Sequence, residues 1–166
     1  ASLLMADLYK QAGLPDGVLN IITGAADTGK ALVAHPDIQM VSLTGSVAAG
    51  RQVMEAAAAN ITKVSLELGG KAPAIVLKDA DIDLAVKAIL ASRVGNSGQI
   101  CNCAERVYVH SSIHAAFVEK ITAAMQAVRY GNPAEAAEGA LEMGPLIEER
   151  AVEAVAEKVQ RAVAQG

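Results

Sequence analysis

The chain has 166 residues, of which 52% are hydrophobic and 19% charged, and its net charge is −4. So high an apolar content excludes a disordered chain and is ordinary for a soluble globular protein with a real core. The slight negative charge, with three Tyr, one Phe and no Trp, offers a nucleic acid neither a basic surface nor many stacking partners. We therefore expect no nucleic-acid partner.

A membrane partner is also not expected, because no apolar run approaches the roughly 20 residues that span a bilayer. The first stretch contains Asp7 and Lys10, where a signal peptide would be purely apolar, so we expect a cytoplasmic protein. A helical pattern still runs up to Gly166, and we expect the chain to continue beyond both ends as part of a longer parent.

The first part of the chain alternates helical and strand-like patterns. Apolar residues at helical spacing predict helices, and short runs rich in β-branched residues predict strands. The expected order is helix 2–12, strand 18–22, helix 27–34, strand 40–43, helix 47–59 and strand 63–68. Because such alternation favours right-handed crossovers and a parallel sheet, we expect part of a doubly wound, Rossmann-like α/β domain.

The pattern changes at Gly69 and Gly70, where we expect a domain boundary between residues 1–69 and 70–166. The segment 79–81 (Asp-Ala-Asp) is expected to cap the helix that follows it. The expected elements are a buried strand at 73–77, a helix from 82 to 90, a strand at 106–110 and helices at 112–128 and 147–164. A loop that carries both cysteines precedes the second of these strands.

Residues 24–30 form a first glycine loop, which fits the pattern G-x-x-x-x-G-K between a strand and a helix. In a phosphate-binding loop, backbone N–H groups and the lysine hold the phosphates, so Gly24, Gly29 and Lys30 are candidate cofactor contacts. The residue after Lys30 is Ala31, which has no hydroxyl to offer Mg²⁺. A plain strand-to-helix turn is therefore favoured over an NTPase loop.

Gly45 and Ser46 form a second glycine loop, between the expected strand 40–43 and the expected helix 47–59. Ser46 is placed to cap that helix, which would stabilise it by about 1 kcal/mol. The same position suits a second interpretation, in which exposed N–H groups and the positive end of the helix dipole face a dinucleotide pyrophosphate. The spacing alone leaves both interpretations open.

The two cysteines, Cys101 and Cys103, are one residue apart, where a disulfide would close a very small, strained ring. His110 and His114 lie nearby, but the spacing does not match a zinc site, so we expect no metal. We expect solvated or capping roles for these two histidines and for His35.

A nucleophile and a base are available in Cys101 and Glu67. Cys101 lies in the small polar loop 96–101, where a thiol is well placed to ionise, although both cysteines could equally be small buried hydrophobes. Glu67 interrupts the strand 64–68, which is otherwise suited to burial, and a carboxylate there suits a general base or merely points outward. Together the two groups suggest covalent catalysis followed by hydrolysis.

These residues lie in segments that resemble the aldehyde dehydrogenase superfamily. Residues 67–73 (ELGGKAP) resemble its glutamate motif and residues 98–101 (GQIC) its cysteine motif, and the separation of Glu67 and Cys101, 101 − 67 = 34 residues, suits the family. Further similar segments are the cofactor loop at 43–50, the linking turn and strand at 13–20, and residues 102–106, which look most like lactaldehyde or glycolaldehyde dehydrogenases.

The resemblance implies a partial cofactor-binding domain that leads into the α/β catalytic domain of an aldehyde dehydrogenase. It implies that Cys101 attacks an aldehyde, that hydride passes to NAD or NADP, and that water activated by Glu67 hydrolyses the thioester to the acid. Ser46 and Gly45 would lie against the pyrophosphate, and the Leu68 backbone near the nicotinamide. The implied substrate is a small hydroxyaldehyde, and the implied parent is a homo-oligomer, a dimer or tetramer.

Some features depart from the family or leave alternatives. The loop 24–29 is one residue shorter than usual, which weakens the contacts expected from Gly29 and Lys30. Asn102 is expected to contact the substrate or to structure its loop. The chain lacks segments that complete the family's pocket, so we expect it to be inactive alone. A non-catalytic nucleotide-binding module and a succinate-semialdehyde-type dehydrogenase are the alternative functions.

Overall fold

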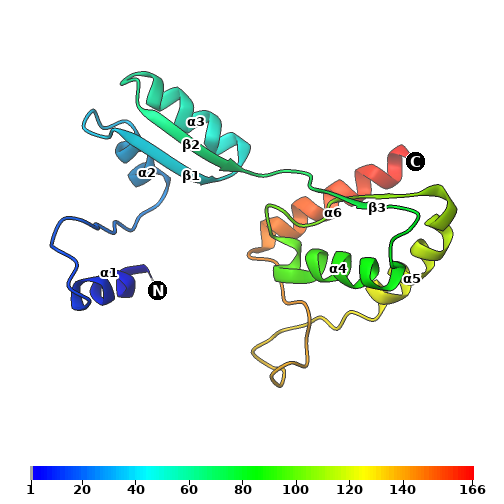
Figure 1. Cartoon of the computed structure of the whole chain (residues 1–166). Helices are drawn as coiled ribbons and strands as arrows, with labels where there is room; N and C mark the ends of the chain where they lie inside the picture. The colour runs from blue at the N-terminus through cyan, green and yellow to red at the C-terminus, as the bar shows by residue number, and fades with distance from the viewer. Residues whose placement is uncertain (1) are drawn as a thin grey trace. The chain divides into compact units, whose positions relative to one another are not determined.

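The computed structural model describes residues 2–166, which form an α/β fold (Figure 1). The chain divides into two compact units, of which the first ends at Leu68 and the second spans Gly69–Gly166. This division lies one residue before the position expected from the sequence. Among the described residues, no helix has the length and apolar character needed to cross a membrane.

The first unit contains one parallel strand pair and the helix that connects its strands. Strands β1 and β2 pair in register from Met40↔Lys63 to Gly45↔Leu68, and α3 makes the crossover between them. Exposed and half-buried residues alternate along both strands, because only one face of the pair is covered by helix. The elements are α1 (Ser2–Gln11), α2 (Ala26–Val33), β1 (Met40–Gly45), α3 (Val47–Ala58) and β2 (Lys63–Leu68).

The strand expected at 18–22 is wrong. This segment has no ladder partner among residues 2–166, and Val18 and Ile22 are exposed. A strand is stable only when a neighbouring strand takes up its N–H and C=O groups, and an apolar, β-branched composition does not supply that neighbour.

The second unit holds the other parallel pair, β3 and β4, in register from Pro73↔Arg106 to Val76↔Val109. Asp81 accepts a hydrogen bond of 3.0 Å from the Leu84 N–H, which confirms the predicted N-cap of α4. The elements are β3 (Pro73–Val76), α4 (Ile82–Val94), η1 (Gly95–Gly98), β4 (Arg106–Val109), η2 (Ser111–Ile113), α5 (His114–Gln126) and α6 (Glu149–Gln165).

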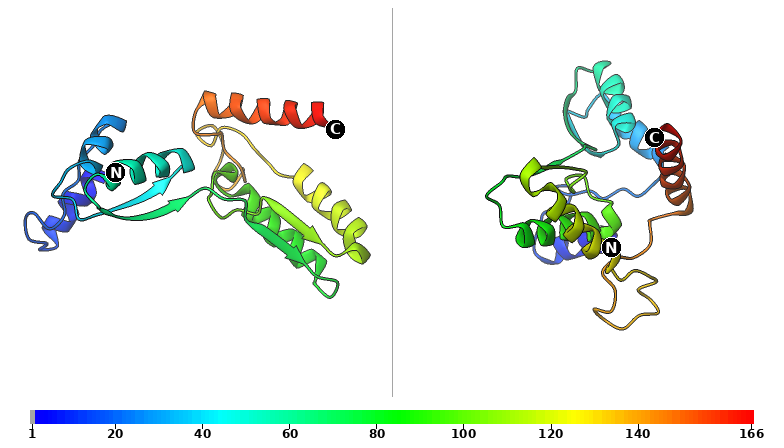
Figure 2. Two further views of the ribbon diagram at one scale, coloured as in Figure 1. Left: turned by 90° about the horizontal axis from the view of Figure 1, so that it is seen from above. Right: turned by 90° about the vertical axis from the view of Figure 1, so that its right-hand side faces the viewer.

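The core of the second unit lies between β3 and the helices α4 and α5, which Figure 2 shows beside the strand pair. Its buried residues are Val76, Val86, Ile89 and Phe117. The expectation that 73–77 is a buried strand is therefore only half right, because Ile75 and Leu77 are 69% and 60% exposed. Successive strand residues point to opposite faces, and α4 and α5 cover the face that carries Val76.

Candidate active site

Cys101 lies in the segment that connects α4 to β4, which we call the cysteine loop (residues 95–105). Three successive residues in this loop, Asn96, Ser97 and Gly98, have positive φ angles of 47°, 57° and 74°. The left-handed region is unfavourable for residues other than glycine, so such a run persists only where surrounding contacts hold it. The loop has one defined conformation that brings the backbone sharply round before Cys101.

Side-chain contacts hold that conformation. Asn96 Nδ2 donates to the Gln99 carbonyl at 3.2 Å, and Gln99 Nε2 donates back to the Asn96 carbonyl at 2.9 Å. Gln99 Oε1 also accepts from the Ile147 N–H at 2.9 Å, while Ser97 Oγ donates to the Gly144 carbonyl at 2.7 Å. The polar residues of the loop, which the sequence marked as poor core material, therefore act as its internal and external ties.

The structure separates the two thiols. Both are free, but Cys101 is exposed, whereas Cys103 is buried with 2% of its surface accessible. The interpretation that both cysteines are small buried residues is thus correct for Cys103 and wrong for Cys101. The chain turns at residues 101–103, where the Cys103 N–H donates to the Ile100 carbonyl at 3.3 Å, and the two thiols therefore face different ways.

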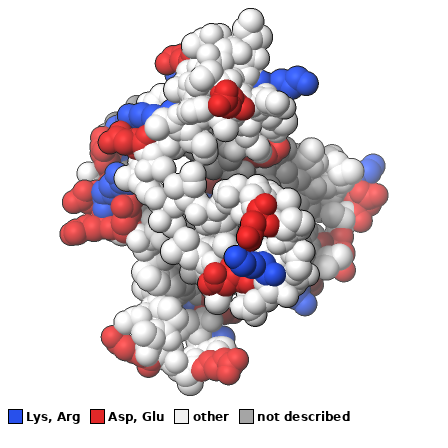
Figure 3. All heavy atoms as spheres, turned by 90° about the vertical axis from the view of Figure 1, so that its left-hand side faces the viewer, with Lys and Arg blue, Asp and Glu red and all other residues white. Residues whose placement is uncertain are grey.

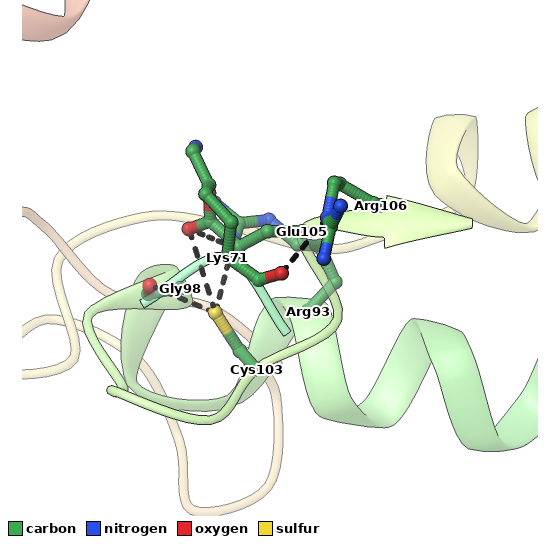
Figure 4. Close-up of polar contacts among 6 residues, drawn as sticks. All are labelled: Lys71, Arg93, Gly98, Cys103, Glu105 and Arg106. Carbon is green, nitrogen blue, oxygen red and sulfur yellow. Dashed lines mark hydrogen bonds and ion pairs between the residues drawn. The ribbon is translucent and has the colours of Figure 1, made fainter. Parts of the chain in front are cut away.

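Cys103 is part of a polar cluster that the sequence did not reveal (Figure 4). Arg93 Nη1 lies 2.8 Å from Cys103 Sγ and also donates to Glu105 Oε1 at 3.1 Å. Lys71 Nζ donates to the other oxygen of Glu105. Chiefly this hydrogen bond lowers the pKa of Glu105 below its usual value; burial opposes the shift, and the charges of Lys71 and Arg93 reinforce it.

Glu67 is the second-last residue of β2, opposite Thr44 of β1, and its side chain is exposed. The alternation along β2 thus points it away from the helix-covered face, as one of the two interpretations allowed. Glu67 belongs to the first unit and Cys101 to the second. Their meeting in one active site stays a prediction.

The cofactor-side residues lie around the turns of the first unit. Ser46 Oγ accepts from the Ala49 N–H at 3.1 Å, so Ser46 does cap α3. Gly24 approaches Thr28 so closely that a Cβ at this position would lie 2.1 Å from Thr28 Oγ1. Gly45 and Leu68 face each other as the last residue pair of the sheet.

A cavity of about 250 Å³ lies between α2, β1 and α3 of the first unit. Gly29 and Lys30 line it, whereas Gly24, Gly45, Ser46 and Leu68 do not. Its other lining residues are Ala26, Val33, Leu43, Ala49, Gln52, Val53 and Ala56. The lining is mostly apolar, with one cation from Lys30 and one side-chain amide from Gln52.

The remaining candidates have simple local roles or none that a contact defines. Asn102 is exposed in the cysteine loop. His110 Nδ1 accepts from the Ser112 N–H at 3.2 Å, and His35 Nδ1 accepts from the Asp37 N–H at 3.2 Å, which confirms capping roles for both. Within residues 2–166, no group of three or more His, Cys, Asp or Glu is arranged to hold a metal ion.

Lysine and arginine side chains lie among aspartate and glutamate side chains on the face drawn in Figure 3. This mixture follows from a composition of 14 basic and 18 acidic residues. Opposite charges also pair in the second unit, where Arg93 pairs with Glu105 and Arg129 with Glu142.

Comparison with known proteins gives concordant matches. The chain is 55% identical over 166 residues to lactaldehyde dehydrogenase of Escherichia coli (strain K12), with 99% of this chain and 34% of that protein covered. The crystal structure of the Escherichia coli lactaldehyde dehydrogenase superposes with a TM-score of 0.93, over 99% of this chain and 34% of that one.

At lower identity the chain also matches enzymes that are named for other substrates. Succinate-semialdehyde dehydrogenase [NADP(+)] of Escherichia coli (strain K12) is 43% identical, with 100% of this chain and 34% of that protein covered. A structure of 3,6-anhydro-L-galactose dehydrogenase in complex with NAP is 42% identical, with a TM-score of 0.91 over 99% of this chain and 34% of that one.

The chain thus spans about one third of the length of the relatives it matches (34%). The sequence profile of the aldehyde dehydrogenase family matches residues 1–166, the whole chain. This match agrees with the glutamate and cysteine motifs and with the superposition on solved enzymes. The chain belongs to the aldehyde dehydrogenase family.

Proposed function

We propose that this chain supplies the nucleophile and the water-activating carboxylate for NAD(P)-dependent oxidation of an aldehyde to a carboxylic acid. The observation that carries the proposal is the contrast between the two thiols. Cys101 is exposed on a loop held in a left-handed conformation, whereas Cys103 is buried two residues later. A nucleophile must be reached by its substrate and held in a fixed orientation, and Cys101 meets both conditions.

In the proposed first half of the reaction, the Cys101 thiolate attacks the aldehyde carbon. A C–S bond forms, the carbonyl electron pair moves onto oxygen, and the Cys101 backbone N–H helps to stabilise the oxyanion. A bound nicotinamide would supply the hydride acceptor for that carbon, and Cys101 would then hold the acyl group as a thioester. The negative charge of the thiolate and the positive charge of the oxidised nicotinamide would cancel, because the thioester and the reduced nicotinamide ring are both neutral.

In the proposed second half, Glu67 removes a proton from water, and the water oxygen attacks the thioester carbon. The C–S bond breaks, the acid leaves, Cys101 is free again as the thiolate, and Glu67 releases its proton to solvent. A water-activating Glu67 argues against transfer of the acyl group to coenzyme A, because water must be kept from the thioester in that reaction.

For the cofactor we propose NAD, with NADP as the alternative. Gly29 and Lys30 line the cavity between α2 and α3, which supports a role for both in binding part of the nucleotide. Ser46 and Gly45 are proposed to face the pyrophosphate, Leu68 to offer its backbone near the nicotinamide, and Gly24 to shape the first loop. One relative is named for NADP(+) and one solved structure is a complex with NAP, so the choice between the two cofactors is made by experiment.

For the substrate we propose a small hydroxyaldehyde such as lactaldehyde or glycolaldehyde, with Asn102 as a contact. The support is the 55% identity to a lactaldehyde dehydrogenase, compared with 43% to a succinate-semialdehyde dehydrogenase. We propose that the chain acts in the cytoplasm as part of a longer parent that forms a dimer or tetramer. Because it spans only 34% of these relatives, we propose that it is inactive alone.

The test uses the full-length protein that contains this sequence and follows NAD(P)H formation with lactaldehyde, glycolaldehyde and succinate semialdehyde. Cys101→Ala should abolish oxidation, while the matched variant Cys103→Ala should still oxidise the aldehyde, at a reduced rate. Glu67→Gln should still form one equivalent of NAD(P)H but release acid slowly. Sustained turnover in Cys101→Ala would overturn the mechanism.

A non-catalytic nucleotide-binding module is a second candidate, and the cavity that Gly29 and Lys30 line favours it. The two candidates differ in the role of the second unit, which only the enzyme needs. Cofactor binding without aldehyde oxidation in the unchanged full-length protein would support the module.

A further inference from the structure

One polar cluster in the second unit is not used by the reaction proposed above. It consists of Lys71, Arg93, Cys103 and Glu105, and we call it the Glu105 cluster (Figure 4). Its members come from separate elements. Lys71 precedes β3, Arg93 lies in the last turn of α4, and Cys103 and Glu105 lie between Cys101 and β4. The cluster therefore joins three elements around the end of the cysteine loop.

Each oxygen of the Glu105 carboxylate has its own cationic partner. Lys71 Nζ donates to Oε2, and Arg93 Nη1 donates to Oε1 at 3.1 Å. The same Arg93 nitrogen lies 2.8 Å from Cys103 Sγ, and Cys103 Sγ is 3.5 Å from the Gly98 carbonyl. Glu105 thus orients Arg93, and Arg93 in turn fixes the thiol that is two residues after Cys101.

Backbone contacts extend the same restraint. The Glu105 N–H donates to the Ala72 carbonyl at 3.0 Å, and the Ala104 N–H donates to Ser92 Oγ at 3.0 Å. The Cys103 N–H donates to the Ile100 carbonyl at 3.3 Å, which closes a turn around Cys101. Residues on both sides of Cys101 are consequently held, while the Cys101 side chain itself stays exposed.

We expect the Glu105 cluster to affect the position of Cys101 more than the stability of the protein. Ion pairs near the surface contribute little to stability, and 23% of the Glu105 side chain is exposed. By contrast, a displacement of a reacting group by about 1 Å can lower a rate by about a hundredfold. A carboxylate that receives two cations is rigid enough to prevent such a displacement.

We propose that Glu105 is a positioning residue for Cys101: through Arg93 and Cys103 it holds the turn that aims the nucleophile and its backbone N–H. This inference rests on the proposed role of Cys101. It assigns Glu105, Lys71 and Arg93 no contact with the substrate. It predicts that loss of the Glu105 charge slows the step in which Cys101 reacts and loosens the burial of Cys103.

The first experiment measures the rate constant of NAD(P)H formation in a single turnover, with the full-length protein and coenzyme in excess over aldehyde. The protein concentration is raised until the rate constant no longer changes, so that a smaller folded fraction alone leaves the rate constant unchanged. Glu105→Gln should lower it about tenfold. The control is Asp83→Asn on α4, which removes a carboxylate paired with Lys120 of α5 and should leave the rate constant unchanged.

The second experiment needs no coenzyme and counts thiols labelled by iodoacetamide in the native protein. Trypsin cleaves after Arg93 and Arg106, so one peptide, 94–106, carries both cysteines and reports both labels by mass. The unchanged protein and Asp83→Asn should carry one label on this peptide, on Cys101. Glu105→Gln should carry a second label, because Cys103 loses the partner that keeps Arg93 over it.

The proposal is overturned if the Glu105→Gln rate constant stays within about twofold of the unchanged protein, or if its peptide keeps a single label. Cys101→Ala is run in the same single-turnover assay to separate this outcome from failure of the proposed function. NAD(P)H formation by Cys101→Ala would show that Cys101 is not the nucleophile. Its absence, together with an unaffected Glu105→Gln, would remove only the positioning role.

Discussion

Ser97 Oγ donates a hydrogen bond of 2.7 Å to the carbonyl oxygen of Gly144, a residue 47 positions later in the sequence. The contact ties the cysteine loop to the segment before α6, and the Ile147 N–H adds a second tie to Gln99 Oε1. Ser97 has a positive φ of 57°, so the serine accepts an unfavourable backbone conformation in order to make this bond. The hydrogen bond and the conformation therefore have opposite effects on stability.

Two substitutions separate these effects. Ser97→Ala loses the hydrogen bond but keeps the backbone cost, and we expect the free energy of unfolding to fall by about 1 kcal/mol. Ser97→Gly also loses the hydrogen bond but relieves the left-handed conformation, so it should be more stable than Ser97→Ala. Urea unfolding of the two variants measures the difference, and a less stable glycine variant would contradict the assigned role of the left-handed turn.

Gly98 and Gly139 give a matched pair of glycines with nearly equal positive φ angles, 74° and 73°. A Cβ at Gly98 would lie 2.8 Å from Arg93 Nη2 and 3.2 Å from the Arg93 carbonyl, whereas a Cβ at Gly139 meets nothing within 4 Å. Gly139→Ala should cost only the backbone strain of about 1 kcal/mol, and Gly98→Ala should cost more and expose Cys103. Thermal unfolding and thiol labelling test this; equal losses in both variants would show that Arg93 does not restrict Gly98.

The sequence predicted most of the helices and all four strands in the described residues to within about two residues, because their periodic patterns are local, but it also predicted one strand that is absent. The strand expected at 18–22 failed for a non-local reason, since pairing depends on a neighbour that composition does not encode. The expected burial of Ile75 failed in the same way. Which face of a strand is covered depends on where α4 and α5 pack.

The candidate site, too, could be predicted from the sequence only where local motifs identify its residues. Motifs identified Cys101 and Glu67, but thiol burial distinguishes Cys101 from Cys103 only in three dimensions. Lys71 and Glu105 were missed, although one signal was present: they are 105 − 71 = 34 residues apart, the same separation as Glu67 and Cys101. The parallel register pairs Pro73 with Arg106 and so brings together the residues just before the two strands, Lys71 and Glu105 among them; the sequence alone does not specify that pairing.

The Glu105 cluster also predicts a pH dependence. Lys71 and Arg93 lower the pKa of Glu105, so its folded pKa lies below its unfolded pKa. The resulting stabilisation is present in full above the unfolded pKa and is lost as the pH falls through the folded pKa. The stability difference between the unchanged protein and Glu105→Gln should therefore be constant near neutral pH and shrink in the acidic range below the usual carboxyl pKa.

The pKa of Glu142 is also lowered, chiefly by a hydrogen bond from the Arg129 N–H, so we expect its stabilisation to depend on pH in the same direction. Denaturant unfolding of Glu105→Gln and Glu142→Gln beside the unchanged protein, at a series of pH values from neutral to acidic, measures both effects. Each difference should narrow on acidification. A difference that grows as the pH falls would mean that the carboxylate is not stabilised in its charged form.

Ser46 has one contact that the structure defines and one role that is proposed, and a pair of substitutions distinguishes them. Its Oγ accepts from the Ala49 N–H at 3.1 Å as the N-cap of α3. Ser46→Ala removes the cap and should lower the free energy of unfolding by about 1 kcal/mol.

Ser46→Asp keeps a good cap, so it should retain stability, but its negative charge would repel a pyrophosphate held at the same helix terminus and weaken dinucleotide binding at least about tenfold. Denaturant unfolding and a fluorescence titration with NAD and NADP, both on the full-length protein, measure the two quantities. Undiminished affinity in Ser46→Asp would place the pyrophosphate elsewhere and leave Ser46 with capping alone.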